Sequence, residues 1–315
     1  MRLATFETEG AQRLGAVIDG DGDAATIVDV LAAAAALAAE GRGPSYPLPD
    51  TMMALLQGGE SAMDAVRDVL DALSATPPRH AGQRYEYPLD AVRLRAPLPV
   101  PGKILCIGQN YRDHVLEQNG KMPERPIIFA KFANTVIGPD DEIIYPITTK
   151  TLDYEGELVV VIGRGGKHIS RETAYDHVAG YMAGQDVTAR DIQKGDGQWV
   201  RGKTQDASAP MGPYLVTRDE VPDPQALDIK LWVNGEIRQD SNTVNLIFDV
   251  PTLIAFISEG ITLAPGDLIY TGTPPGVGAF RTPPAFLQVG DEVTVELTGL
   301  GQLTNRVAAD ALAPA

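Results

Sequence analysis

Two patterns of apolar and polar positions divide the chain into a shorter N-terminal part and a longer remainder. In the N-terminal part, residues 6–17 have the alternation of a short hairpin, which we expect the Asp-Gly-rich residues 19–23 to close. An alanine-rich stretch and a stretch with apolar residues at helical spacing predict helices over residues 26–40 and 61–73. These elements predict a small α+β domain over residues 1–93, in which no residue suggests a catalytic role.

The remainder consists mainly of short β-like runs separated by Gly and Pro. The clearest runs predict strands over residues 103–107, 126–132, 157–163, 179–186, 227–233, 267–271 and 292–297. Helical patterns are fewer and cover residues 111–119, 189–194 and 250–259. Many short strands with few helices favour a β-rich mixed roll or barrel over a doubly wound sheet. We therefore predict an α+β protein whose second domain covers residues 94–315.

Charge and cysteine content narrow the possible partners. The chain has 42 acidic and 26 basic side chains, for a formal net charge of −16. Phosphate backbones and anionic membrane surfaces attract basic proteins, so this balance excludes nucleic acid and membranes as partners. The single cysteine, Cys106, excludes an intrachain disulfide framework and a cysteine-rich zinc site. No apolar run reaches the roughly 18 residues of a membrane span, and a signal-peptide pattern is missing. We expect a cytoplasmic protein.

Two glutamates at the start of an apolar run are the first candidates for chemistry. Glu155 and Glu157 are two residues apart, so in a strand their carboxylates lie on the same face. Like charges this close repel each other, and a divalent cation with oxygen ligands would relieve the repulsion. The alternative is an edge strand whose acids face water, which is the commoner arrangement for an isolated pair.

A third acid, Asp186, ends another predicted strand. It could serve only as the N-cap of the helix that follows. As a third ligand beside Glu155 and Glu157, it would complete a Mg²⁺ or Mn²⁺ site with open positions for substrate. Arg190 and Gln193 are three residues apart and share one face of that helix, and the planar guanidinium of Arg190 suits a substrate carboxylate.

His114 and Glu117 are the candidate general base and its partner. Their helical spacing would let the Glu117 carboxylate orient and polarise the imidazole of His114. An exposed surface pair is the alternative. Gly and Asn residues on both sides predict a mobile segment, as a lid requires.

Three further polar residues lie in conspicuous positions. Lys131 interrupts an apolar strand, where a lysine commonly extends to solvent. Lys203 lies shortly before a segment rich in Ala, Pro and Gly. Thr273 belongs to a Gly/Pro-rich turn that could bind an anion through backbone N–H groups or form only a tight turn. The turn lacks the Gly-Lys-Ser/Thr ending of a Walker A motif.

Taken in order, these motifs resemble the fumarylacetoacetate hydrolase family. The resemblance runs from about residue 94 to residue 307, and each motif is weak alone, but five in the family's order make a specific match. The motifs are Gly108-Gln109-Asn110-Tyr111 with His114 and Glu117, Asp153-Tyr154-Glu155-Gly156-Glu157, Asp186-Val187-Thr188-Ala189-Arg190-Asp191, Lys203, and Thr271-Gly272-Thr273-Pro274. The N-terminal segment resembles the domain appended to the longer bacterial members.

The resemblance implies a β-rich roll with a divalent metal site, usually in a homodimer. It implies Mg²⁺ or Mn²⁺ as the cofactor and a small 2-oxo or 2,4-dioxo acid as the substrate. It assigns the metal ligands to Glu155, Glu157 and Asp186, the catalytic roles to His114, Glu117 and Lys203, and substrate binding to Arg190, Gln193, Thr273 and Lys131.

Two segments depart from the family's pattern. Lys203 is followed by Thr-Gln-Asp-Ala-Ser, where members often have Ser-x-Asp-x-Phe, and Lys131 is followed by Phe-Ala-Asn, where Pro-x-Ser is more usual. These departures leave the pocket for the substrate's tail unpredicted, whereas the three acids and the His–Glu pair are kept.

The reaction that the resemblance implies first is hydrolysis of a C–C bond in a 2,4-dioxo acid, either an acylpyruvate or a sugar-derived diketo acid. His114, held by Glu117, would activate water, and the leaving group would be an enolate stabilised at the metal site, with Lys203 and Thr273 neutralising charge on oxygen. An oxaloacetate-type decarboxylase or a dioxo-acid tautomerase is the alternative, because both reactions pass through the same enolate. A non-catalytic carboxylate-binding protein would be expected to lack the pair or a ligand, and neither is lost here.

Overall fold

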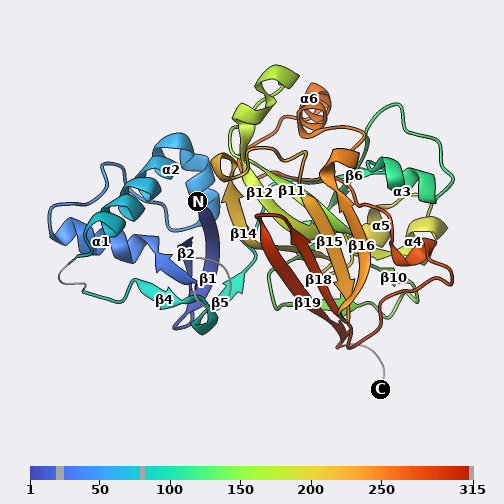
Figure 1. The fold of residues 1–315 in the computed structure, drawn as a ribbon, viewed down its shortest axis with the longest axis horizontal. Helices are drawn as coiled ribbons and strands as arrows, with labels where there is room; N and C mark the ends of the chain where they lie inside the picture. The colour runs from blue at the N-terminus through green and yellow to red at the C-terminus, as the bar shows by residue number, and fades with distance from the viewer. Residues whose placement is uncertain (19–24, 79–81, 312–315) are drawn as a thin grey trace.

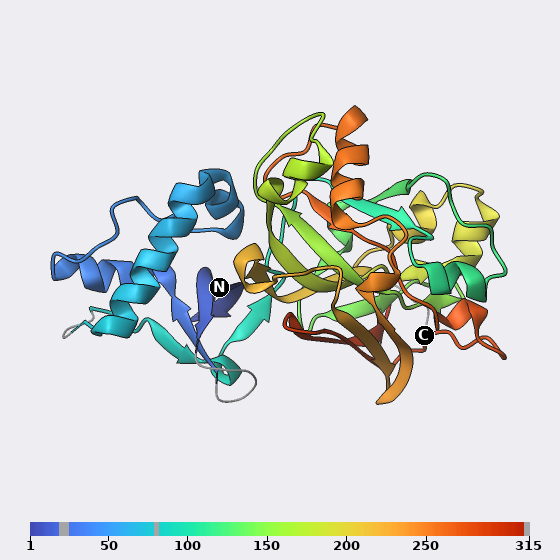
Figure 2. The ribbon, with the colours of Figure 1, turned by 45° about the horizontal axis from the view of Figure 1, so that its top comes forward.

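The computed structural model describes residues 1–18, 25–78 and 82–311, and the predicted hairpin closure at residues 19–23 lies outside them. Figures 1 and 2 show an N-terminal segment with two long helices beside a larger body built from two packed sheets. The helices are α1 (Val30–Ala39), α2 (Met52–Ala75), α3 (Arg112–Glu117), α4 (Arg190–Gly195), α5 (Val200–Lys203) and α6 (Val250–Gly260). Short 3-10 helices include η4 (Arg171–His177) and η7 (Gly278–Phe280).

The larger sheet has strand order β4-β3-β2-β1-β14-β12-β11-β17-β6-β7, with β5 on β1 and β8 on β14. Its strands are β1 (Arg2–Thr8), β2 (Ala11–Ile18), β3 (Thr26–Asp29), β4 (Glu86–Pro88), β5 (Arg93–Arg95), β6 (Ile104–Gly108), β7 (Ile127–Lys131), β8 (Val136–Ile137), β11 (Gly156–Ile162), β12 (Val178–Gln185), β14 (Ala209–Thr217) and β17 (Leu268–Tyr270). β1 pairs with β14, so one sheet continues from the N-terminal segment into the body. The division into domains at residue 93 stays a prediction.

A five-stranded sheet packs against one face of the larger sheet. Its order is β16-β15-β18-β19-β9, and its strands are β9 (Glu142–Tyr145), β15 (Asp228–Val233), β16 (Glu236–Asn242), β18 (Glu292–Leu297) and β19 (Gly301–Ala309). A separate pair is formed by β10 (Leu152–Asp153) and β13 (Thr188–Ala189). The α+β, sheet-rich fold is confirmed, and it is a roll, because neither large sheet closes into a barrel in the described part of the chain.

β11 lies between two apolar cores, which explains its uninterrupted apolar run. Leu158 and Val160 belong to the core shared with the five-stranded sheet, whereas Val159 and Val161 belong to the core on the opposite face, where α2 packs. A strand buried on both faces has no need of alternating polar positions. Glu155 and Glu157, at the start of this run, therefore lie at the edge of an apolar interior.

The N-terminal segment contains the predicted hairpin, but with a different closing turn, and it corrects both predicted helices. β1 and β2 pair antiparallel around a turn at residues 9–10. Residues 26–29 form β3 rather than helix, because Ile27 and Val28 pair with β2 and the Asp29 carboxylate accepts the Ala32 N–H and so begins α1 there. The second helix begins earlier than predicted, at Met52, and is kinked at Gly59, whose φ is +64°.

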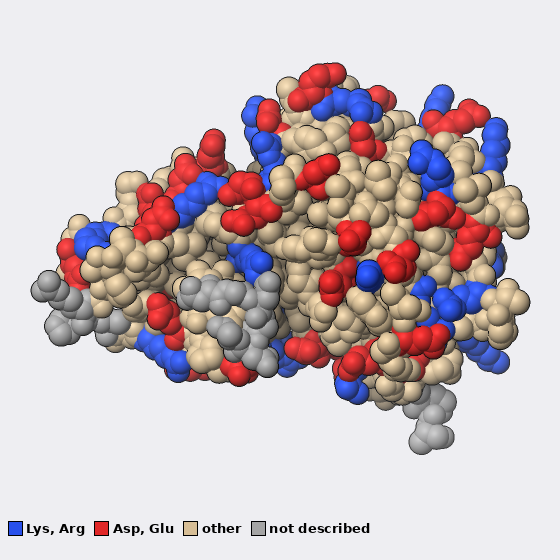
Figure 3. All heavy atoms as spheres, in the orientation of Figure 1, with Lys and Arg blue, Asp and Glu red and all other residues tan. Residues whose placement is uncertain are grey.

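In the body, the predicted strands and helices are present, with ends shifted by one or two residues, and further strands were missed. β14 contains two prolines, and β16 is mostly polar because it lies at the edge of its sheet. No helix of the described chain is both long and apolar enough to cross a membrane. On the face shown in Figure 3, basic side chains lie singly or in small groups between acidic ones, as the net charge predicts.

Candidate active site

A cavity of about 310 Å³ opens where the ends of β6, β7 and β11 meet α3, α4, α5 and η7. Its lining combines charged side chains with the aromatic rings of Phe129, Trp199 and Phe280. Seven of the ten predicted site residues line it: His114, Glu155, Glu157, Arg190, Gln193, Lys203 and Thr273. The other three do not line it: Glu117 contacts His114, Asp186 contacts Lys203, and Lys131 contacts Asp186.

The three predicted acidic residues come together at the ends of β11 and β12. Antiparallel pairing of these strands places the Asp186 N–H 2.9 Å from the Glu155 carbonyl oxygen, beside Glu157. Carboxylate oxygens of the three side chains all lie within 4.8 Å of one another. Each residue is at most 5% exposed, so the solvated edge strand considered as an alternative is wrong.

Two buried lysines neutralise part of this acidic cluster. The Lys203 ammonium donates to Glu155 and to Asp186, both at 2.7 Å. The Lys131 ammonium lies 2.9 Å from the other oxygen of Asp186. Lys131 therefore does not extend to solvent, and the Asp186 side chain pairs with lysines rather than capping α4.

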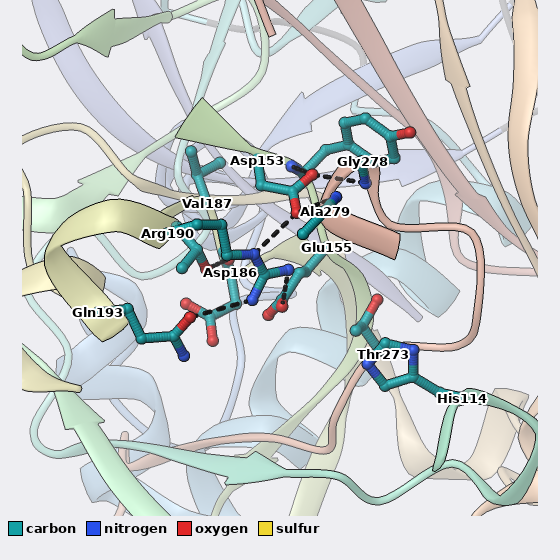
Figure 4. Close-up of polar contacts among 12 residues, drawn as sticks. His114, Asp153, Glu155, Asp186, Val187, Arg190, Gln193, Thr273, Gly278 and Ala279 are labelled. Carbon is teal, nitrogen blue, oxygen red and sulfur yellow. Dashed lines mark hydrogen bonds and ion pairs between the residues drawn. The ribbon is translucent and has the colours of Figure 1, made fainter. Parts of the chain in front are cut away.

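Arg190 connects the acidic cluster to a residue that the sequence analysis gave no role, Asp153. Its guanidinium lies 2.6 Å from Glu155 and donates to Asp153 at 2.8 Å (Figure 4). Asp153, fully buried, also accepts the backbone N–H groups of Gly278 and Ala279 at 2.7 and 3.0 Å. A Cβ at Gly278 would lie 2.6 Å from that carboxylate, so only glycine fits. Asp153 thus couples α4 to η7.

Burial and unequal pairing set the protonation of the two glutamates. Burial, together with the nearby Asp186 and Glu155 carboxylates, raises the pKa of Glu157 well above its ordinary value. Burial acts in the same direction on Glu155, but Arg190 and Lys203 outweigh it and lower the pKa of Glu155 to about 2.

Glu157 is the carboxylate that the protein leaves without a cationic partner. Its side chain accepts the Gly272 N–H at 2.7 Å, and none of the ion pairs among the described residues includes it. A cation beside Glu155, Glu157 and Asp186 would remove the cost of ionising it, and three carboxylate oxygens are the ligands that hard divalent ions prefer. The residues present therefore fit a divalent metal ion.

His114 is buried and Glu117 is partly buried, so the exposed surface pair considered as an alternative is wrong. His114 is 5% exposed, and its Nδ1 lies 3.1 Å from Glu117, whose other oxygen accepts the Gly276 N–H at 3.0 Å. The Nε2 atom lies 2.7 Å from the amide nitrogen of Gln118, a contact that the sequence analysis missed. With a proton on Nδ1 directed at Glu117, Nε2 carries the lone pair that a general base needs.

The segment before α3 is fixed by Asn110, which is fully buried. Its side-chain amide donates to the carbonyl oxygens of Thr271 and Phe248 at 2.8 and 3.1 Å and accepts the Phe248 N–H. The preceding residue, Gln109, has a φ of +54° and lines the cavity. The segment that leads into α3 is thus hydrogen-bonded to the Gly/Pro-rich turn. The role of α3 as a lid stays a prediction.

Thr273 and Gln193, which are predicted to contact substrate, both line the cavity. The Thr273 hydroxyl donates to the Gly156 carbonyl oxygen at 3.0 Å and accepts from the Gln239 amide at 2.8 Å. Gln193 accepts from Arg190 at 3.3 Å, as their shared helical face predicts. Gln239 is a further residue that sequence patterns missed, because it lies on the polar strand β16.

A roll of two sheets with a buried carboxylate triad beside a His–Glu pair defines an enzyme site of the kind the sequence motifs suggested. A family model described as fumarylacetoacetate (FAA) hydrolase C-terminal matches residues 103–308. The chain belongs to the fumarylacetoacetate hydrolase family.

Two relatives carry the same description of activity. The chain is 46% identical over 261 residues to the mitochondrial oxaloacetate tautomerase Fahd2a of Rattus norvegicus, covering 82% of this chain and 80% of the relative. It is 39% identical over 311 residues to the oxaloacetate tautomerase YisK of Bacillus subtilis, covering 98% and 100%. The second match includes nearly all of the N-terminal segment.

Solved structures confirm the fold but differ in their named activities. A fumarylacetoacetate hydrolase from Exiguobacterium antarcticum is 36% identical with a TM-score of 0.79 and covers 98% of this chain and 100% of its own. A 2-hydroxyhepta-2,4-diene-1,7-dioate isomerase from Mycobacterium marinum is 32% identical with a TM-score of 0.73 and covers 99% of both chains.

Proposed function

We propose that this protein is a tautomerase that interconverts the enol and keto forms of oxaloacetate. The observation that carries the proposal is the buried His114 base beside a carboxylate triad in a cavity of about 310 Å³, a size that suits a small acid. The two relatives described above, both oxaloacetate tautomerases, support this reaction over the C–C hydrolysis that the motifs implied first. Hydrolysis becomes the second candidate, supported by the hydrolase among the similar structures.

Tautomerisation needs one proton moved between carbon and oxygen. In the keto-to-enol direction, a base takes a proton from C3, and the electron pair of that C–H bond becomes the C2=C3 double bond. The π pair of the C2 carbonyl moves to its oxygen, which then receives the proton from the protonated base. The Nε2 atom of His114 would take the proton from C3, while Glu117 stabilises the imidazolium that forms. Gln118 would leave Nε2 when the substrate enters.

The other residues would hold the substrate and its developing charge. A divalent ion, Mg²⁺ or Mn²⁺, held by Glu155, Glu157 and Asp186 would supply Lewis acidity at the 2-oxo carboxylate end. Lys203, buried against the triad, would neutralise negative charge on the C2 oxygen, with the Thr273 hydroxyl beside it. Asp153 would keep Arg190 in place through its contacts to η7.

The experiment that tests the proposal compares two substrates. With Mg²⁺ or Mn²⁺, the protein should speed the decay of the ultraviolet absorbance of enol-oxaloacetate, and acetylpyruvate should yield no acetate. Release of acetate and pyruvate from acetylpyruvate, without an effect on oxaloacetate, would overturn the proposal in favour of a hydrolase. Pyruvate and CO₂ from oxaloacetate would instead indicate a decarboxylase.

Several expectations from the sequence belong to this proposal. We propose a homodimer in the cytoplasm, with residues 1–93 forming an appended domain. Mass measurement in solution and limited proteolysis around residue 93 test the assembly and the boundary.

A further inference from the structure

Lys194 lies on α4, directly after Gln193, and lines the active-site cavity although it is exposed to solvent. Its ammonium stands 6.0 Å from the centre of the Phe280 ring. The same ring meets the imidazole of His114 edge-on, with centres 5.8 Å apart. A cation near the face of an aromatic ring is attracted to it through a cation–π interaction. The ammonium is therefore positioned at the open end of the cavity, across one aromatic ring from the base.

Lys194 differs from the other cationic side chains that line the cavity. Arg190 is paired with Asp153 and Glu155, and Lys203 is paired with Glu155 and Asp186. No carboxylate of the described residues forms an ion pair with Lys194. Its charge remains available for a ligand.

The buried charges at the closed end of the cavity can balance only one substrate carboxylate. When ionised, the buried cluster contains four carboxylates and three cations: Asp153, Glu155, Glu157 and Asp186 against Lys131, Arg190 and Lys203. A divalent ion would turn the net charge of −1 into +1, which the 2-oxo carboxylate of the substrate would balance. A second carboxylate would find no unpaired cation there, and the aromatic rings of Phe129 and Trp199 cannot solvate it.

We propose that Lys194 binds the second carboxylate of a C4 2-oxo dicarboxylate and so makes the site selective for diacids over monoacids. The inference rests on the proposed function, because oxaloacetate is such a diacid. The charge-assisted contact at the cavity entrance would hold the distal carboxylate while the 2-oxo end lies against the triad. This residue determines specificity and takes no part in proton transfer.

The test compares two stable ligands that differ only at the distal group. Malate and 2-hydroxybutyrate have the same carbon chain, with a methyl group in place of the second carboxylate in the latter. In the presence of Mg²⁺, titration calorimetry should show Lys194→Met weakening malate binding about tenfold, while 2-hydroxybutyrate binding changes less than about twofold. Lys194→Arg should keep the preference for malate, and added salt should reduce it.

A matched control is Lys167→Met, which removes one exposed lysine charge that is not part of the cavity lining. It should leave both affinities unchanged. Because Lys194 is exposed, its variants should unfold at the wild-type temperature, which a thermal melt checks.

The outcomes separate this inference from the proposed function. Loss of the malate preference in Lys194→Met without any wild-type tautomerase activity would support the diacid subsite and overturn the function. Tautomerase activity with an unchanged KM for oxaloacetate and an unchanged malate preference in Lys194→Met would overturn the subsite and keep the function. Failure of the wild-type protein to prefer malate would also overturn the subsite.

Discussion

The N-terminal segment and the active-site cavity lie on the same large sheet but bury different kinds of side chain. Between α1 and α2 the core is apolar, with residues such as Leu37, Val69 and Leu73. In residues 1–93, the buried polar side chains that the structure describes are Thr5 and Asp29. Around the ends of β11 and β12, by contrast, four carboxylates and three cations are buried together.

This difference shows that the free-energy cost of burying charged groups is concentrated at the active site. Apolar burial stabilises a fold without specific partners, whereas each buried charge must be paired or it favours unfolding. Around the cavity, the stability of the fold therefore depends on a network of paired charges, in which loss of one partner is costly. In the N-terminal core, stability depends on how well apolar side chains fill the space. Four experiments test this contrast, from the largest expected effect to the smallest.

Removal of the base should have the largest effect, and on activity alone. His114→Ala should lower the rate of oxaloacetate tautomerisation by about 10²–10⁴-fold, the usual contribution of general base catalysis. Stabilisation of the protein by Mg²⁺ in a thermal melt should persist, because the triad is intact. Near wild-type turnover in this variant would exclude His114 as the base.

Removal of a cation from the buried cluster should be the most destabilising change. Lys203→Met leaves Glu155 and Asp186 short of a partner, and breaking a buried ion pair in this way costs about 3–5 kcal/mol. Urea unfolding with a chelator present measures this loss, and added Mg²⁺ should recover part of it. Lys167→Met serves as the surface control. Equal stability of the Lys203 and Lys167 variants would contradict the contrast.

Truncation in the N-terminal core should lower stability and leave the chemistry alone. Leu37→Ala opens a cavity at a fully buried position, and such changes cost about 2–5 kcal/mol. The variant should keep the wild-type kcat at a temperature where it is folded. A fall in kcat as large as that of an active-site variant such as His114→Ala would show that the two regions are coupled.

The pH dependence of stability that Glu157 causes should disappear when metal is added. The pKa of Glu157 is raised in the metal-free fold, so above the ordinary value of 4.5 the unfolded chain releases this proton first, and rising pH destabilises the fold until Glu157 ionises. Glu155, with a pKa of about 2, contributes stability that is present above 4.5 and lost only as pH falls towards 2.

Unfolding free energies of wild type and Glu157→Gln, measured with a chelator across this pH range, isolate the contribution of Glu157. Without metal, the advantage of Glu157→Gln over the wild type should grow with pH. This growth should disappear when Mg²⁺ saturates the wild type, since the ion favours the ionised carboxylate. A difference that does not vary with pH would contradict a raised pKa of Glu157 in the metal-free fold.

Local patterns in the sequence were enough for much of the body. The apolar runs of β6 and β11, the alternation in β18 and the helical spacing in α3 and α6 depend on backbone periodicity, which neighbouring residues determine. The same periodicities placed Glu155 beside Glu157 and His114 beside Glu117. Prolines in β14 and the polar surface of β16 hid these strands, because position in a sheet overrides local preference there.

The sequence by itself therefore determined the sheet-rich class and the residue pairs that lie within a few positions of each other. Only the tertiary structure decided which distant groups meet: Lys131 with Asp186, Arg190 with Asp153, and Glu157 with the backbone of Gly272. These contacts join residues 37 to 115 positions apart, across strand pairings that no local period encodes. Burial of the charges follows from the same pairings. Burial raises the pKa of Glu157, whereas Arg190 and Lys203 lower the pKa of Glu155, so a cation beside the triad would favour the ionised form of Glu157.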